Sequence, residues 1–121
     1  MSSRFTELVI DCADPARVAA FWCEVLGWRV LERGPLGEVE IGGDGPPSPT
    51  LVFVPVPEPK SVKNRVHIDV NPVGCDQAEE LQRLLELGAR QVDVGQGDDK
   101  TWVVLADPEG NEFCLLRRRV D

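Results

Sequence analysis

The sequence has no excess of basic residues, and this absence excludes two classes of partner. Lys and Arg number 13 against 21 Asp and Glu, which gives a formal net charge of −8 at pH 7. Nucleic acids and anionic membranes bind cationic protein surfaces, so neither is an expected partner. The one basic run, 117–119, is interpreted as a solvated strand end rather than a binding patch.

Long apolar runs and familiar cofactor motifs are also lacking. A membrane-spanning helix needs about 18 or more apolar residues, and the run 8–10 near the N-terminus is too short even for a signal peptide. We therefore expect a cytoplasmic protein. No GxGxxG motif, P-loop or Ser/His/Asp order is present. Nucleotide binding and serine-hydrolase chemistry are not indicated.

The four cysteines do not form a zinc-knuckle or redox CxxC pattern. In a reducing compartment such residues behave as small apolar side chains, so we expect free and mostly buried thiols. The four residues are Cys12, Cys23, Cys75 and Cys114.

What is present is an internal repeat within one domain of 121 residues. In the first half, alternation and turn residues predict strands at 5–12, 28–32, 37–41 and 50–56. The second half predicts strands at 65–70, 89–94, 101–106 and 112–117. Asp14-Pro15 and Gly27 delimit a helix over 15–26, and a second helix is predicted over 76–87 with Gly88 after it.

Each half therefore has the order β-α-β-β-β. Module 1 covers about 4–56, a stiff Pro-containing linker covers 57–63, and module 2 covers about 64–118. An offset of 60 residues aligns Glu7 with His67 and Val54 with Cys114. Two copies of one unit predict an α+β fold with pseudo-two-fold symmetry and a shared cleft.

Several segments resemble the glyoxalase/bleomycin-resistance/extradiol-dioxygenase (vicinal oxygen chelate) superfamily over roughly 4–118. They are the helix entry 14–22 (DPARVAAFW), the segment 63–69 (KNRVHID), the turn 106–111 (ADPEGN) and the strand start 111–114 (NEFC). The resemblance implies curved mixed sheets that form a cup, with helices on the outer face. It also implies a small-molecule ligand in that cup.

In metal-dependent members, the resemblance places ligands on the first and last strands of both modules. The corresponding positions here are Glu7, Val54, His67 and Cys114. Val54 cannot bind a metal, and Cys114 stands where a glutamate is expected. The resemblance therefore implies a weak ion site or none.

Strand alternation predicts which side chains face the cup. His67, the only histidine, is a candidate base or ligand for Zn, Ni, Mn or Fe. The alternative is a histidine bonded to a neighbouring carboxylate or to the backbone. Glu112 is a candidate general base or third ligand, or else a carboxylate paired with Arg65 or Arg117. The remaining predicted ligand-binding positions are Glu7, Val9, Val54, Asp69, Trp102 and Cys114.

Two functions remain open at this level. One is a small-molecule-binding protein without a tight metal, whose acidic cup favours a cationic ligand. The other is a lyase, isomerase or dioxygenase that uses a divalent metal held by His67, Glu7 and Glu112. Because exposed strand edges must be paired or covered, we also expect a homodimer.

Overall fold

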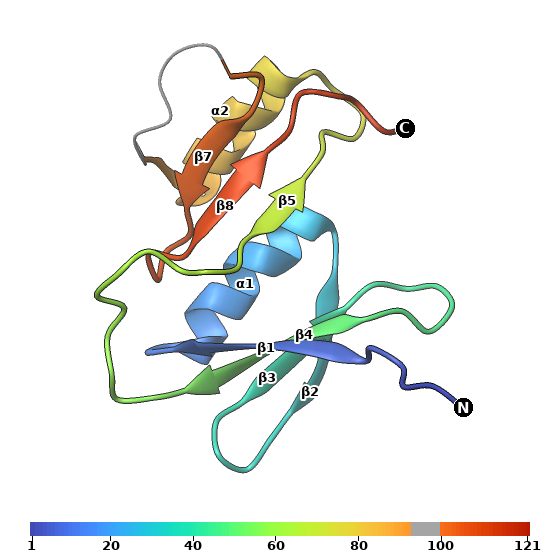
Figure 1. Ribbon diagram of the computed structural model, residues 1–121, viewed down its shortest axis with the longest axis vertical. Helices are drawn as coiled ribbons and strands as arrows, with labels where there is room; N and C mark the ends of the chain where they lie inside the picture. Colours follow the sequence, from blue (N-terminus) through green and yellow to red (C-terminus); the bar gives the residue numbers. More distant parts are fainter. Residues whose placement is uncertain (93–99) are drawn as a thin grey trace. The chain divides into compact units, whose positions relative to one another are not determined.

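The computed structural model describes residues 1–92 and 100–121, which divide into two compact units, Met1–Pro59 and Lys60–Asp121. Each unit contains one helix and one four-stranded mixed sheet (Figure 1). The chain thus has two tandem βαβββ modules, which confirms the predicted α+β fold class. Neither helix in the described part of the chain is long and apolar enough to cross a membrane.

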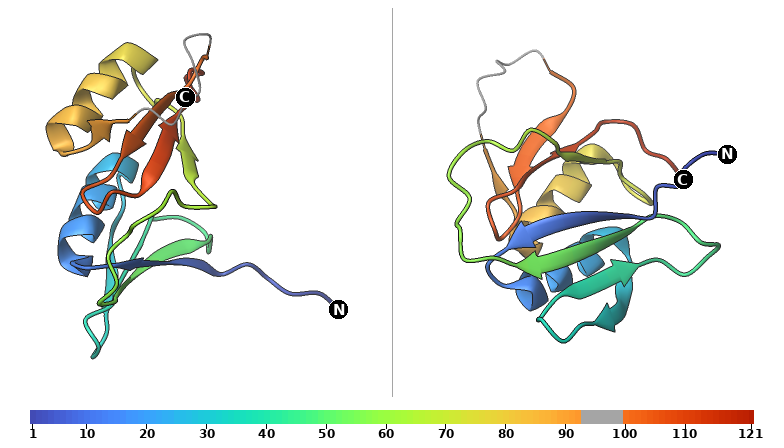
Figure 2. Two further views of the ribbon diagram at one scale, coloured as in Figure 1. Left: turned by 60° about the vertical axis from the view of Figure 1, so that its left-hand side comes forward. Right: turned by 60° about the horizontal axis from the view of Figure 1, so that its bottom comes forward.

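The first sheet has the strand order β1-β4-β3-β2. β1 runs parallel to β4, and the other two pairings are antiparallel. Its strands are β1 (Glu7–Cys12), β2 (Arg29–Arg33), β3 (Val39–Gly42) and β4 (Thr50–Pro55). Helix α1 (Pro15–Leu26) packs against β3 and β4 (Figure 2).

Helix α1 begins and ends where the local sequence predicts. The Asp14 side chain accepts a hydrogen bond from the Arg17 backbone N–H at 3.2 Å, and Pro15 occupies the first helical turn. Gly27 adopts a φ of 68°, and the Trp28 N–H donates to the Cys23 carbonyl at 3.0 Å. This left-handed glycine satisfies the last carbonyl groups of the helix.

The core of the first unit lies between α1 and its sheet. Val18, Ile41 and Phe53 are fully buried, and Trp22 is 1% exposed. The Trp22 ring meets Phe21 edge-on, with 5.4 Å between centroids. The prediction that Trp22 is a core residue is confirmed.

The second sheet has the corresponding order β5-β8-β7-β6, again with one parallel pair, β5 with β8. Its strands are β5 (Ile68–Val70), β6 (Arg90–Gln91), β7 (Val103–Ala106) and β8 (Glu112–Leu115). Helix α2 (Gln77–Leu87) is capped by Asp76, whose side chain accepts from the Glu79 N–H at 2.9 Å. The predicted strand end at 93–94 and turn at 95–99 lie outside the described residues.

All four predicted strands of this unit are longer than the strands seen in the described residues; β8, for example, ends at Leu115 and not at 117. β5 starts at Ile68, so residues 65–67 precede it, and β7 starts at Val103, so Thr101 and Trp102 form a bend. The Thr101 carbonyl accepts from the Gln77 side chain at 2.8 Å. A side-chain hydrogen bond therefore occupies a backbone carbonyl that a longer β7 would have used.

The predicted 60-residue offset cannot hold both for the first strands of the modules, β1 and β5, and for their last strands, β4 and β8. Val54 lies opposite Asp11 in the first sheet, whereas Cys114 lies opposite Asp69 in the second. If Val54 corresponds to Cys114, then Val9 corresponds to His67, and Glu7 does not. The discrepancy is two residues, which is one full pleat. Because side chains alternate with a period of two, each predicted facing is retained.

Candidate functional site

A polar centre lies on β5 and β8, on the face of the second sheet opposite its apolar core. Register places Asp69 beside Cys114, and Cys114 beside Val104. The alternate residues Phe113 and Leu105 are fully buried on the other face. Strand alternation thus separates the candidate site from the core, as the sequence predicts.

The centre consists of His67, Asp69 and Cys114. The His67 Nε2 lies 3.1 Å from Asp69 Oδ1, and these side chains are 44% and 48% exposed. One nitrogen, oxygen or sulfur atom from each of the three residues lies within 4.8 Å of the others. The predicted alternative in which His67 bonds a neighbouring carboxylate is therefore present, and Asp69 is that carboxylate.

The Cys114 thiol is held in its protonated form. Burial raises its pKa, and the negative charge of Asp69 and a hydrogen bond to that residue raise it further. Lys63 acts in the opposite direction and does not outweigh these effects. At neutral pH, Cys114 is therefore a poor nucleophile and must lose a proton before it can bind a metal.

Glu112 is not part of this centre. Its Oε2 lies 2.8 Å from the Lys60 Nζ, and its Oε1 accepts from the Asn64 backbone N–H at 3.1 Å. Burial acts to raise the pKa of Glu112, but the hydrogen bonds from Lys60 and Asn64 outweigh it, so the net shift is downward. Both carboxylate oxygens are engaged, so Glu112 forms an ion pair as in the predicted alternative, but its partner is Lys60 and not Arg65 or Arg117.

A second network joins the segment before β5 to the turn before β8. The Asn64 Nδ2 donates to Asn111 Oδ1 at 2.8 Å. Asp107, only 2% exposed, accepts from the backbone N–H groups of Glu109 and Asn111 at 2.9 Å each. The two sequence segments 63–69 and 106–111 thus form one hydrogen-bonded unit that leads directly into His67.

Sequence reasoning missed the roles of Lys60, Asn64 and Asp107. The signal for Asp107 is the DPEGN turn, in which Asp favours side-chain bonding to the backbone two residues on. Lys60 and Asn64 carry no such local signal, because their partners lie 52 and 48 residues away in the chain.

The other predicted site residues lie on separate elements. Glu7 and Val9 are exposed on β1, with Val9 opposite Val52, and Val54 is half-buried on β4. Trp102 is 39% exposed, and the Lys100 Nζ lies 6.0 Å from its ring centroid. Trp102 is therefore not a fully buried core residue.

The cysteines are all free: Cys12 and Cys114 are buried, whereas Cys23 and Cys75 are half-buried. The Cys12 Sγ lies 3.7 Å from the Val54 carbonyl. The expectation of free thiols is confirmed, and burial holds for two of them.

Solved structures with the same fold support this architecture. The manganese-bound fosfomycin resistance protein FosX from Listeria monocytogenes has a TM-score of 0.71 at 12% identity, over 99% of this chain and 95% of that chain. Glyoxalase I from Leishmania major has a TM-score of 0.65 at 17% identity, over 96% and 87%. TnmS3, an antibiotic-binding protein from Streptomyces sp. CB03234, has a TM-score of 0.62 at 21% identity, over 95% of each.

At these identities the likeness concerns the fold. No curated protein matches the sequence significantly. The sequence profile of the family described as "Glyoxalase-like domain" matches residues 7–116, which is nearly the whole chain. The chain therefore belongs to the glyoxalase-like domain family.

Proposed function

We propose that this protein binds a small organic molecule at the polar centre of His67, Asp69 and Cys114, without a tightly held metal. The observation that carries the proposal is the half-exposed His67–Asp69 pair beside a buried, protonated thiol. Such a centre offers an acceptor carboxylate and an oriented imidazole on the strand face opposite the apolar core.

The charge of this centre favours a cationic ligand. Asp69 is an exposed carboxylate, and the protein carries a net charge of −8. A cationic ligand gains attraction from the whole-protein field and donates a charge-assisted hydrogen bond to Asp69. His67, held by Asp69 through Nε2, has its second ring nitrogen as a further hydrogen-bonding atom.

The donor chemistry supports binding without a metal. Glu112, the predicted third ligand, is already bound by Lys60 and Asn64. Cys114 must be deprotonated against the effects of burial and of Asp69. Moreover, Val9 rather than Glu7 corresponds to His67 when the last strands are aligned, so the sequence argument for Glu7 as a ligand is weaker.

A second candidate function is a metal-dependent lyase, isomerase or dioxygenase. One observation favours it: imidazole, carboxylate and thiol atoms meet within 4.8 Å, and this donor set fits a Zn-type ion. His67, Asp69 and Cys114 would hold the ion in place of the predicted set of His67, Glu7 and Glu112. When bound, such an ion would supply Lewis-acid stabilisation of negative charge on a substrate oxygen.

Several predicted contacts remain proposals. We propose that Val9, Val54 and Glu7 of the first module and Trp102 of the second contribute to ligand binding. Titration of single alanine variants with benzylammonium distinguishes the residues that contribute to binding from those that do not.

The proposed function is tested by NMR, because the single histidine has one set of imidazole resonances. We expect benzylammonium to shift the His67 resonances, and the neutral isostere benzyl alcohol to shift them less. Asp69→Asn should weaken benzylammonium binding about tenfold, as loss of a charge-assisted hydrogen bond implies. His67→Ala should weaken benzylammonium binding, which is measured by fluorescence. This effect should be larger than the effect of the same variant on thermal stability.

The matched control is Asp44→Asn, which removes the same charge from an exposed loop residue that pairs with Arg29. Equal weakening by both Asp variants would contradict a site at Asp69. Elemental analysis and calorimetry with Zn, Ni, Mn and Fe(II), before and after chelation, test the second function. About one metal ion per chain, lost in the His67→Ala variant, would favour that function over the first.

A further inference from the structure

A concavity of about 670 Å³ lies in the second unit, where the chain leaves β8. It shares no residue with the polar centre, because its walls follow β5 and β8 and precede β7. Its lining residues are Asn71, Thr101, Leu116, Arg117 and Arg118. None of these residues is among the predicted ligand or metal positions.

Hydrogen bonds join the three segments that form the walls. The Asn71 Nδ2 donates to the Arg118 carbonyl at 2.9 Å, and the Leu116 N–H donates to the Val70 carbonyl at 2.8 Å. The Gln77 side chain donates to the Thr101 carbonyl at 2.8 Å and to the Leu115 carbonyl at 3.2 Å. The concavity is therefore built by the fold and does not depend on one loop.

The lining is cationic, in contrast to the rest of this acidic protein. Within the described ranges, neither Arg117 nor Arg118 forms an ion pair, whereas the neighbouring Arg119 is paired with Asp121 at 2.9 Å. That pair lowers the pKa of the Asp121 carboxyl well below its usual range. The two guanidinium groups at the concavity therefore keep their full donor capacity.

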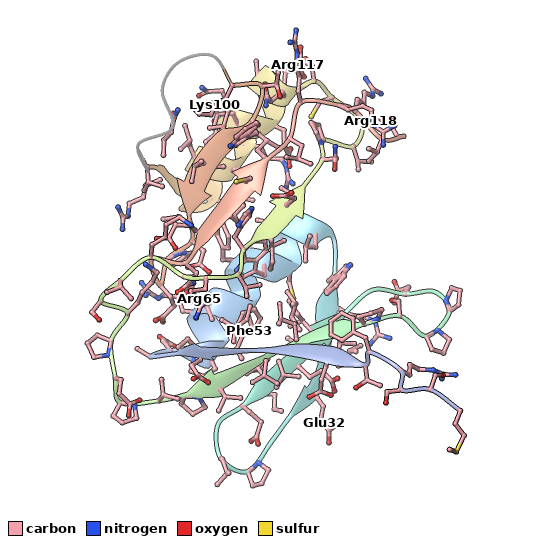
Figure 3. The ribbon with its side chains drawn as sticks, in the orientation of Figure 1. Glu32, Phe53, Arg65, Lys100, Arg117 and Arg118 are labelled. Atoms are coloured by element: carbon pink, nitrogen blue, oxygen red, sulfur yellow. The ribbon has the colours of Figure 1, made fainter. Side chains whose placement is uncertain are left out.

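A third cation lies at the same end of the sheet. Val103 at the start of β7 pairs with Leu115 at the end of β8, so Lys100 lies near the segment that carries Arg117 and Arg118 (Figure 3). Adjacent like charges repel one another, and an anion placed between them removes that repulsion.

We propose that this concavity binds the oxyanion group of a small organic acid, a phosphate or a carboxylate. Guanidinium groups recognise both anions through paired N–H donors. The Thr101 hydroxyl adds a polar group, and Leu116 provides an apolar wall for the organic part of the ligand. This proposal does not depend on the function proposed for His67, Asp69 and Cys114, and it replaces the interpretation of 117–119 as only a solvated strand end.

The test is a titration of the full chain with phenyl phosphate and with benzoate, followed by backbone amide NMR shifts. We expect both anions to shift the amides of Thr101, Leu116 and Arg118, and benzyl alcohol to leave them unchanged. Added NaCl should weaken binding. Tighter binding of phenyl phosphate assigns a phosphorylated ligand, and tighter binding of benzoate assigns a carboxylate ligand.

The double variant Arg117→Gln/Arg118→Gln should weaken binding of the preferred anion about tenfold or more. Its matched control is Arg29→Gln/Arg33→Gln, which removes two positive charges from β2 of the other unit and should leave affinity within about twofold. Equal weakening in both double variants, or no shift with either anion, would overturn the proposal. All four arginines are exposed, so both variants should fold.

Discussion

At the scale of single residues, hydrogen bonds rather than strand position decide what each carboxylate does. Asp69 and Glu112 lie on neighbouring strands of one sheet. Asp69 is half-exposed and bonds the imidazole of His67. Glu112 is mostly buried, with its side chain 15% exposed, and bonds Lys60 and the Asn64 N–H. The first is available to a ligand, and the second stabilises the fold.

Glu112→Gln should therefore reduce stability in a pH-dependent manner. The folded-state pKa lies below the ordinary value of 4.5, so the ionised carboxylate stabilises the fold above that pH. We expect a loss of about 1–2 kcal/mol in unfolding free energy at pH 7. The difference from the natural protein should shrink as pH falls from 4.5 through the lowered pKa, because the natural carboxylate becomes protonated.

Urea unfolding at several pH values measures this effect. Glu86→Gln, an exposed position on α2, is the control and should change little at any pH. A Glu112→Gln deficit that persists unchanged in acid would show that the charge of Glu112 is not the cause.

At the scale of elements, the turn between β7 and β8 sets the start of β8. The Asp107 carboxylate bonds two backbone N–H groups, and Gly110 closes the turn with a φ of 87° and an N–H···O bond to Asp107 at 2.8 Å. Asn111 then links the turn to Asn64. The turn therefore positions both the last strand and the segment that leads to His67.

Asp107→Ala should lower the unfolding free energy by about 2–3 kcal/mol, because the backbone N–H groups of the half-buried Glu109 and Asn111 lose a charged acceptor. Asp107→Asn retains an acceptor oxygen and should cost less than half as much. Urea midpoints of the three proteins measure the difference. A loss below about 0.5 kcal/mol for Asp107→Ala would contradict the role given to this turn.

At the scale of the whole molecule, the sheet of each module has two edge strands. β1 and β2 are the edges of the first sheet, and β5 and β6 those of the second. β1 is six residues long, and its Val9 is 51% exposed. An edge strand of this kind favours pairing with another chain.

We therefore predict a two-fold symmetric homodimer. Light scattering should give about twice the chain mass of 13.3 kDa at micromolar concentration. The mass of a single chain under these conditions, in moderate salt, would contradict the prediction. Dilution and cross-linking of the same sample distinguish a weak dimer from a monomer.

The sequence by itself determined the elements of this protein. Both helices begin at an Asp cap and end at a left-handed glycine, Gly27 or Gly88, and these signals act within a few residues of the chain. Alternation also predicted which residues of β5 and β8 share a face, and helical periodicity predicted Trp22 as a core residue. The repeat and the motifs indicated the superfamily, because both are properties of residue order alone.

Only the tertiary structure decided the pairings between elements. That Asp69 binds His67, that Lys60 binds Glu112, and that the first strands of the modules differ in register by two residues could not be read from local pattern. Alternation repeats every two residues, so it specifies a face but leaves register undetermined by whole pleats. Packing and long-range hydrogen bonds choose among those registers, and with them which side chains meet at a site.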